Sequence, residues 1–176
     1  MKKIISLILA CLLVFGLCAC GNDDPTLVGS NNSGNGTSAG SNDNKEFKLG
    51  DSVELGDVVV TFTDVTKSTG SQFNKPADGK VYVLCEFEIA NNSKEDLAIS
   101  SMLSFKGYCD DYACNYSIGA LMEKGDKGQL DGTVTAGKKM KGVIGYEIPT
   151  DWKELEIHYT PDILSNDKIV FVATNN

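Results

Sequence analysis

Residues 81–89 alternate between two faces, and this alternation limits the fold of the chain more than any other feature. One face carries apolar side chains only: Val81, Val83, Cys85, Phe87 and Ile89. The opposite face carries Tyr82, Leu84, Glu86 and Glu88. Because successive side chains of a β-strand point to opposite sides, the pattern predicts a half-buried antiparallel strand.

Turn-forming residues separate this segment from others with the same period. Residues 50–51, 56–57, 91–96, 135–138 and 149–151 are rich in Gly, Asn, Asp, Ser and Pro, which favour turns. We expect strands between them, over 52–55, 58–65, 81–89, 97–105, 139–148, 154–159 and 169–173. Seven or eight short strands, with no helix of ten residues or more, predict an all-β antiparallel β-sandwich.

The first twenty residues have the features of a lipoprotein leader. Lys2 and Lys3 precede an apolar run over 4–15, and Leu17-Cys18-Ala19-Cys20 resembles the bacterial lipobox. We predict a signal peptide over 1–19, recognition by the peptidase at Leu17, Cys18 and Ala19, and lipid attachment at Cys20. The alternative is an uncleaved anchor, because residues 4–20 are just long enough to span a bilayer. The polar segment that follows Cys20 favours the lipoprotein, held on the extracytoplasmic side of the membrane by two or three acyl chains, such as palmitate.

Residues 20–44 have the composition of a linker. Gly, Ser and Asn fill 15 of the 24 positions from 21 to 44, so we expect a disordered tether. As a flexible coil it would span roughly 25–30 Å and hold the domain clear of the lipid. The remaining residues, 45–176, are enough for one domain with a core but not for two.

The net charge limits the class of partner. The sequence carries 16 Lys and Arg against 24 Asp and Glu, and loss of Lys2 and Lys3 with the leader leaves 14 against 24, a net charge of −10. Nucleic acids and anionic membrane surfaces attract clustered cations instead. We therefore expect no nucleic-acid partner, and contact with the membrane through the lipid anchor alone.

The order of the segments resembles an uncharacterised, domain-of-unknown-function family of bacterial surface lipoproteins, mostly from Gram-positive organisms. The landmarks are Leu49-Gly50-Asp51-Ser52-Val53, residues 81–92, Thr135-Ala136-Gly137-Lys138, Gly145-Tyr146-Glu147-Ile148-Pro149 and Ile169-Val170-Phe171. The resemblance implies an immunoglobulin-like β-sandwich, similar to the mycobacterial immunoprotective extracellular protein, on a Gram-positive cell surface. The family has no established catalytic residues to carry over, and the pair Cys109/Cys114 and residues 123–131 depart from its pattern.

Three cysteines remain in an oxidising compartment after the leader is removed. Cys109 and Cys114 close a short loop, and a disulfide between them is the first of three alternatives. The second is a bond from Cys85 to either of them, and the third is three reduced thiols. Cys85 falls on the apolar face of its strand and is expected to be a small buried hydrophobe.

The residues favour neither catalysis nor a metal or cofactor. His158, the one histidine, falls at a strand position that should face solvent, and no catalytic triad can be built around it. Two cysteines and a distant histidine do not make a zinc site. Residues 126–132 faintly resemble a calcium loop but lack its acidic spacing. We therefore expect no enzyme and no cofactor, and keep a hydrolase or metal-dependent enzyme as a remote alternative.

A tyrosine-rich loop around the two cysteines is the candidate recognition site. It carries Tyr108, Asp110, Asp111, Tyr112 and Tyr116. Tyrosine offers a large contact area at a small entropic cost. We expect a lipid-anchored binding module for a protein or envelope component. The alternatives are that the tyrosines only cover one end of the sandwich, and that the chain is a passive spacer or accessory subunit of an envelope complex.

Overall fold

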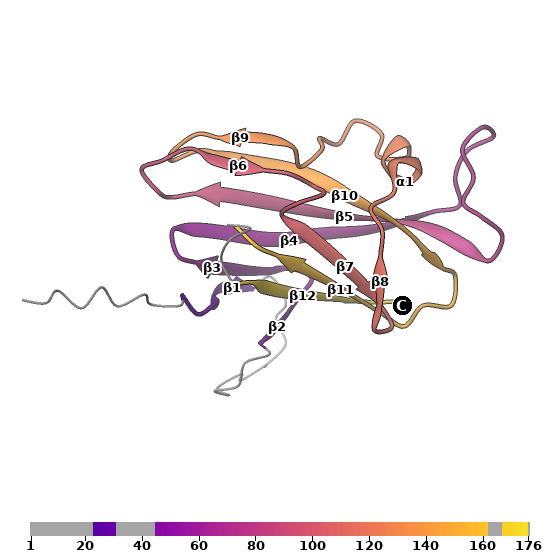
Figure 1. Cartoon of the computed structure of the whole chain (residues 1–176), viewed down its shortest axis with the longest axis horizontal. Helices are drawn as coiled ribbons and strands as arrows, with labels where there is room; N and C mark the ends of the chain where they lie inside the picture. The colour runs from indigo at the N-terminus through magenta and orange to yellow at the C-terminus, as the bar shows by residue number, and fades with distance from the viewer. Residues whose placement is uncertain (1–22, 31–44, 162–166, 176) are drawn as a thin grey trace, which may run out of the picture.

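Two β-sheets packed face to face make up the computed structural model, which describes residues 23–30, 45–161 and 167–175 (Figure 1). The described residues form twelve strands and one short helix. This confirms the predicted antiparallel β-sandwich, with more strands than the seven or eight predicted. The signal peptide and Cys20 lie outside the described residues.

The first sheet has the strand order β1-β3-β4-β5-β10 and is antiparallel throughout. Its strands are β1 (Thr26–Ser30), β3 (Asp51–Leu55), β4 (Val58–Ser68), β5 (Lys80–Asn91) and β10 (Lys139–Pro149). The long strand β5 contains the predicted alternating segment. Its neighbours β4 and β10 pair with it over almost its whole length, so β5 lies at the centre of the longest ladder in the molecule.

The second sheet has the order β2-β12-β11-β7-β8 and covers the inner face of the first. Its strands are β2 (Glu46–Lys48), β12 (Ile169–Thr174), β11 (Glu154–Tyr159), β7 (Phe105–Cys109) and β8 (Tyr112–Cys114). Strands β2 and β12 pair in parallel, and the other pairs of neighbouring strands in this sheet are antiparallel. A small ribbon of β6 (Leu97–Ile99) and β9 (Gly132–Val134) lies beside the two sheets.

Aromatic rings from both sheets meet in the core. Phe62 and Phe87 of the first sheet stack with ring centroids 4.7 Å apart, and both contact the edge of Phe171 from the second sheet. Phe87 also contacts Phe105, whose ring packs on Tyr159. Offset and edge-to-face pairs of this kind stabilise a core beyond the area that they bury. These rings therefore fix how the two sheets face each other.

A short helix changes the environment of the outer face of β5. Helix α1 (Ile118–Met122) begins after Ser117, whose hydroxyl caps it by accepting from the Ala120 amide. Tyr82 and Leu84 pack under α1 in a second apolar cluster. The alternation predicts a half-buried strand, with Tyr82 and Leu84 on its exposed face. In the structure these two side chains are buried, so both faces of β5 are buried near α1. Sequence period alone cannot show that a distant segment folds back over a strand.

Strand β1 corrects the prediction of a disordered linker over 20–44. Thr26–Ser30 pairs antiparallel with β3, with Thr26 opposite Glu54 and Leu27 opposite Val53. Leu27 and Val28 are the apolar residues of an otherwise polar segment, and an open sheet edge supplies the hydrogen bonds that a five-residue segment cannot make alone. The linker prediction is therefore wrong for these five residues.

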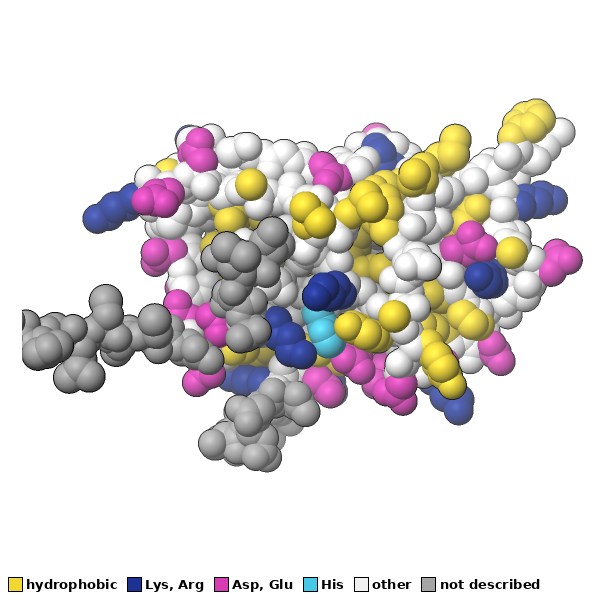
Figure 2. Space-filling model, viewed as in Figure 1, with side chains coloured by type: hydrophobic (Ala, Val, Ile, Leu, Met, Phe, Trp, Pro, Cys, Tyr) yellow, Lys and Arg dark blue, Asp and Glu magenta, His cyan; other side chains and the backbone are white. Residues whose placement is uncertain are grey.

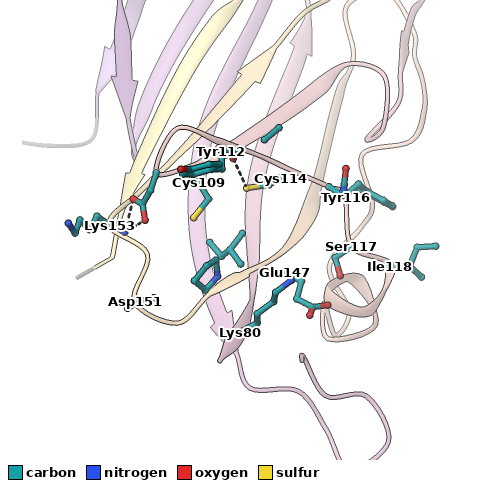
Figure 3. A pocket seen from close by; sticks show the side chains of 15 residues that line it. Lys80, Cys109, Tyr112, Cys114, Tyr116, Ser117, Ile118, Glu147, Asp151 and Lys153 are labelled. Atoms are coloured by element: carbon teal, nitrogen blue, oxygen red, sulfur yellow. Dashed lines mark hydrogen bonds between the residues drawn. The ribbon is translucent and has the colours of Figure 1, made fainter. Parts of the chain in front are cut away.

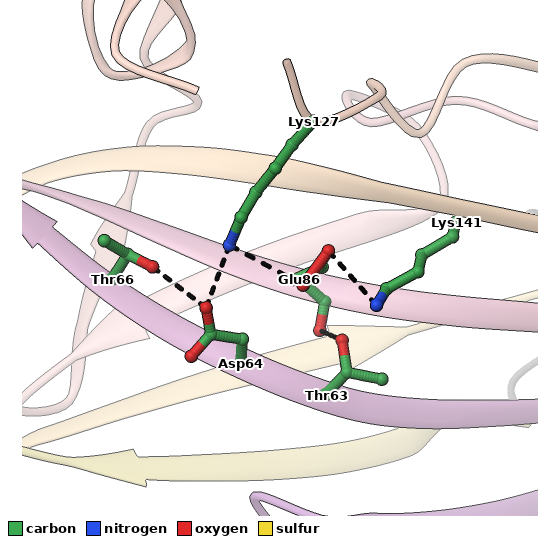
Figure 4. A network of polar contacts seen from close by, with 6 residues as sticks. All are labelled: Thr63, Asp64, Thr66, Glu86, Lys127 and Lys141. Atoms are coloured by element: carbon green, nitrogen blue, oxygen red, sulfur yellow. Dashed lines mark hydrogen bonds and ion pairs between the residues drawn. The ribbon is translucent and has the colours of Figure 1, made fainter. Parts of the chain in front are cut away.

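An ion-pair network holds the chain after α1 against the outer face of the first sheet (Figure 4). Lys127 Nζ lies 2.9 Å from Asp64 Oδ2 and 3.6 Å from Glu86 Oε2, and Lys141 Nζ lies 3.4 Å from Glu86 Oε1. The hydrogen bond from Lys127 lowers the pKa of Asp64, and the same contact raises the pKa of Lys127. Residues 126–132, which faintly resemble a calcium loop, thus place Lys127 against the sheet, where it pairs with Asp64 and Glu86.

Tyr159→Phe should stabilise the protein. Tyr159 is fully buried, and its hydroxyl has no hydrogen-bond partner among the described residues. Burying a polar group without a partner costs about 1–3 kcal/mol, whereas phenylalanine keeps the ring contact with Phe105. We expect the free energy of unfolding to rise by about 1 kcal/mol in urea denaturation. A loss of stability of that size would show that the hydroxyl is satisfied.

Lys127→Met should weaken the fold in a pH-dependent way. Because the pKa of Asp64 is lowered in the folded state, this pair stabilises the protein above the ordinary pKa of an aspartate. That contribution disappears as the pH falls through the lowered pKa. We expect a loss below about 1 kcal/mol at pH 7, since Asp64 is partly exposed, and little difference from wild type at pH 2. Equal losses at both pH values would contradict the ion-pair account.

Candidate functional site

A pocket of about 890 Å³ opens between the two sheets, at the end of the sandwich where α1 lies (Figure 3). One wall is the β7–β8 hairpin, with Cys109, Asp110, Tyr112 and Cys114. The opposite wall is the end of β10 with the turn that follows it, and Lys80 at the start of β5. The chain from Asn115 to Ile118 closes the third side. The pocket is thus built from three stretches far apart in the sequence: Lys80, residues 109–118 and residues 147–153.

The hairpin tip is held rigidly. Asp110 and Asp111 both have positive φ, 46° and 70°, which is the conformation of a two-residue type I′ turn that Asp tolerates. The Asp110 carboxylate accepts hydrogen bonds from the backbone amides of Lys153 and Glu154, at 3.0 and 2.9 Å for Oδ1. Asp110 therefore fixes the hairpin to the start of β11, and its carboxylate is already occupied.

The structure separates the five residues of the predicted recognition loop. Asp110, Tyr112 and Tyr116 line the pocket, whereas Tyr108 and Asp111 do not. Tyr112 is 80% exposed and holds a large aromatic surface at the rim. The Tyr116 hydroxyl accepts from Gln129 Nε2 at 2.9 Å, and its ring packs against the second apolar cluster. Tyr108 instead packs its ring on His158, with centroids 4.8 Å apart.

Cys109 and Cys114 lie diagonally across the hairpin, since Cys109 pairs with Tyr112 and Cys114 with Gly107. Their thiols contact each other, and both are free, as is Cys85 in the core. Burial raises the pKa of Cys109 and raises the pKa of Cys114 to about 12. The thiolate is the reactive form of cysteine, so both are poor nucleophiles at neutral pH. The disulfide between them stays a prediction.

Gly145 sets the position of α1 beside the pocket. A Cβ at Gly145 would lie 2.8 Å from the Cβ of Ala120, closer than real Cβ contacts come. The absence of a side chain lets α1 pack directly on β10, where the Ser117 amide donates to the Gly145 carbonyl at 2.8 Å. As a result Ile118 lies at the pocket rim with 72% of its surface exposed.

Strand β8 presents an open backbone edge to the pocket. In a two-residue hairpin the pair next to the turn, here Cys109 and Tyr112, exchanges hydrogen bonds, and so does the pair Gly107 and Cys114. Ala113 lies between these pairs, so its amide and carbonyl point away from β7. Among the described strands, β7 is the only partner of β8. Ala113 is also one of the residues that line the pocket.

Charges around the pocket are mixed, with an acidic hairpin tip. Partial burial raises the pKa of Glu154, and the negative charges of Glu46, Glu156, Asp111 and Asp110 raise it further. Lys80 and Lys153 line the other parts of the rim.

Hydrophobic side chains gather on the half of the molecule that holds α1 and the hairpin (Figure 2).

The residues considered for catalysis or metal binding have structural partners. His158 is half-buried on β11, where its Nε2 lies 2.9 Å from Glu156 Oε2. The Asp131 carboxylate accepts from the amide and the hydroxyl of Ser101, at 2.9 and 2.6 Å, and from Gln129. Across residues 23–30, 45–161 and 167–175, no three His, Cys, Asp or Glu side chains come together as a metal site.

Sequence reasoning found one wall of the pocket and missed the others. Lys80, Glu147, Ile148, Pro149, Asp151, Lys153, Ser117 and Ile118 also line it. Pro149 and Asp151 belong to a turn that the sequence predicts, but nothing in their order shows that this turn faces the hairpin. The one available signal is the pair of glycines in β10, Gly142 and Gly145, which indicates close approach of another segment.

The described part of the chain contains no helix long and apolar enough to cross a bilayer. No curated protein matches the chain.

Solved structures share the fold at low sequence identity. A Bacillus subtilis protein assigned provisionally as a lipoprotein (ycdA) is 21% identical, with a TM-score of 0.56; the match covers 66% of this chain but only 36% of that one. The yjhA protein of Bacillus subtilis is 18% identical, with a TM-score of 0.57, over 71% of this chain and 97% of that one. An uncharacterised β-sandwich protein of Clostridium difficile is 15% identical, with a TM-score of 0.48, over 77% and 99%.

The likenesses to ycdA and yjhA agree with the β-sandwich, and the similarity to the mycobacterial immunoprotective extracellular protein stays a prediction. A family model, described as a domain of unknown function, matches residues 47–169, which is most of the sandwich. The chain therefore belongs to the DUF4352 family.

Proposed function

We propose that the chain is a lipid-anchored extracytoplasmic binding module that holds an extended segment of a protein partner in the pocket beside β8. The lipid anchor is the diacylglycerol at Cys20, and the site is the pocket between the β7–β8 hairpin and the end of β10. The domain carries out no reaction; it recognises and retains its partner at the outer surface of the membrane.

The open edge of β8 within the pocket carries this proposal. An added strand gains affinity from main-chain hydrogen bonds and specificity from pockets for alternate side chains. Ala113 offers the outward amide and carbonyl, and Tyr112 and Ile118 offer exposed apolar surface on either side. Edge strands are commonly protected by charge, by proline or by being short; Tyr112–Cys114 carries no charge or proline, and its three residues leave room for a short partner segment only.

The charges around the site favour a segment with basic residues near the hairpin tip. Burial raises the pKa of Glu154, and the negative charges of Glu46, Glu156 and Asp111 raise it further. A lysine or arginine of the partner would relieve this repulsion, and its contribution would weaken with salt.

A passive spacer or accessory subunit is the second candidate. It is favoured by the rigid attachment of the hairpin tip through Asp110, which would serve a structural cover equally well. The two candidates differ in one respect: only a binding module needs the edge of β8 to be free. Catalysis has less support, since the thiols have raised pKa values and His158 is paired with Glu156.

Ala113→Pro should abolish peptide binding without unfolding the protein. Proline removes the outward amide of Ala113, which takes no part in pairing with β7, and proline is tolerated on edge strands. A library of linear ten-residue peptides is selected on the purified chain from residue 21 onward, and the best binder is synthesised. We expect Ala113→Pro to weaken its affinity at least tenfold by calorimetry, with the unfolding midpoint nearly unchanged.

The matched controls separate strand pairing from other contacts. Ala113→Thr changes the side chain but keeps the amide, so it should bind as wild type does. A peptide N-methylated at alternate residues should bind wild type at least tenfold more weakly. A library without any binder, or binding that Ala113→Pro and N-methylation leave intact, would overturn the proposal and favour the spacer.

A further inference from the structure

We infer that β1 is a short strap that turns one end of the sandwich toward the membrane and the pocket away from it. The inference rests on the lipid anchor at Cys20 given under Proposed function. If residues 20–44 were a free linker, the domain could take any orientation relative to the membrane. Pairing of β1 with β3 gives it a defined one.

The first observation is the place where the chain joins the sandwich. Strand β1 pairs with β3 through Thr26, Leu27, Gly29 and Ser30. Just before it, the Asp23 carboxylate lies against the turn between β3 and β4, with Oδ2 3.1 Å from where a Cβ of Gly56 would be. The chain therefore enters the sandwich at residue 23 and at this turn, rather than at residue 45.

The second observation is covalent reach. Three peptide units join Cys20 to Asp23, so their Cα atoms can lie no more than about 11 Å apart in any conformation. A linker that ran free from Cys20 to Lys45 would instead extend over roughly 25–30 Å. Pairing of β1 therefore keeps the β3–β4 turn close to the lipid that Cys20 carries.

Other turns gather at the same end. The Asn92 amide donates to the Asp57 carbonyl at 2.9 Å, and the Asn91 amide donates to the Lys138 carbonyl at 2.9 Å. The turn after β5 and the turn before β10 therefore lie beside the β3–β4 turn. Together they form the end of the sandwich that faces the bilayer, on the left in Figure 1.

The pocket lies at the opposite end. Strand β5 runs without interruption from Lys80, which lines the pocket, to Asn91, at the membrane-facing turns. Twelve residues in extended conformation cover about 36 Å, at about 3.3 Å per residue. With β5 along the bilayer normal, the strap presents the pocket up to about 36 Å farther from the bilayer than the β3–β4 turn.

Charge keeps the membrane-facing end from adhering to the lipid surface. Its turns carry Asp23, Asp57, Glu95 and Asp96 against Lys94 and Lys138. An acidic end is repelled by anionic lipids. The orientation therefore comes from the strap and not from a lipid-binding patch.

Energy transfer on vesicles tests the inference with the full lipidated chain. Asp57→azidophenylalanine and Asp78→azidophenylalanine, both at exposed positions near opposite ends of β5, receive the same donor dye. The acceptor is a dye on the headgroups of vesicles that carry the protein. We expect transfer from position 57 to be several times more efficient than from position 78.

A matched pair of block replacements isolates the strap. Replacing residues 26–30 with Gly-Ser-Gly-Ser-Gly should lower the transfer efficiency from position 57. The efficiencies from positions 57 and 78 should then become more alike. Replacing residues 35–39, which lie outside β1, with the same Gly-Ser-Gly-Ser-Gly sequence should leave both transfer efficiencies unchanged. Equal transfer from the two positions in wild type, or no response to the change at 26–30, would overturn the orientation.

Flotation with the vesicles separates this inference from the anchor. The wild-type chain should float, and a chain that begins at Gly21, and so lacks both the leader and Cys20, should not. A wild-type chain that fails to float overturns the anchor and the orientation together. A chain that floats but gives equal transfer from both labels overturns the orientation alone.

Discussion

The contact of Phe62 and Phe87 with Phe171 is the interaction on which the rest of the structure depends. It joins the two central strands of the first sheet, β4 and β5, to β12 of the second. All three rings are fully buried, and removing a buried phenylalanine costs about 3–5 kcal/mol. Because the two sheets are held together at this cluster, the edges of the sandwich can remain open without loss of the fold. The pocket and the strap both lie at such edges.

The two ends of the sandwich have different roles in this account. At one end, short turns and the entry of β1 bring the chain close to its lipid anchor. At the other end, the hairpin tip held by Asp110 and the helix seated on Gly145 surround the pocket. Strand β5 connects the ends as a rigid rod, since it is paired on both sides over most of its length. A binding site built on such strands is positioned far more closely than one on a free loop.

The sequence predicts the strands whose own periodicity is long enough to recognise. Residues 81–89 alternate over nine positions, and β5 confirms them; the turns at 56–57, 91–96 and 135–138 also match. The three-residue strands β2, β6, β8 and β9 are too short to show any period. Burial of Tyr82 and Leu84 depends on α1, which lies more than thirty residues away in the sequence. Strand β1 has only Leu27 and Val28 to mark it, and its stability comes from β3. The pocket could be predicted only at the hairpin, because its other walls meet through tertiary packing.

Residue-resolved hydrogen exchange of the β8 amides tests the central claim most directly. If β8 presents an open edge to the pocket, the Ala113 amide exchanges rapidly, while the amides of Tyr112 and Cys114, bonded to β7, are protected. Addition of the selected peptide should then slow exchange at Ala113 and leave its neighbours unchanged. Protection of Ala113 in the free protein, or equal exchange at all three amides, would contradict the account.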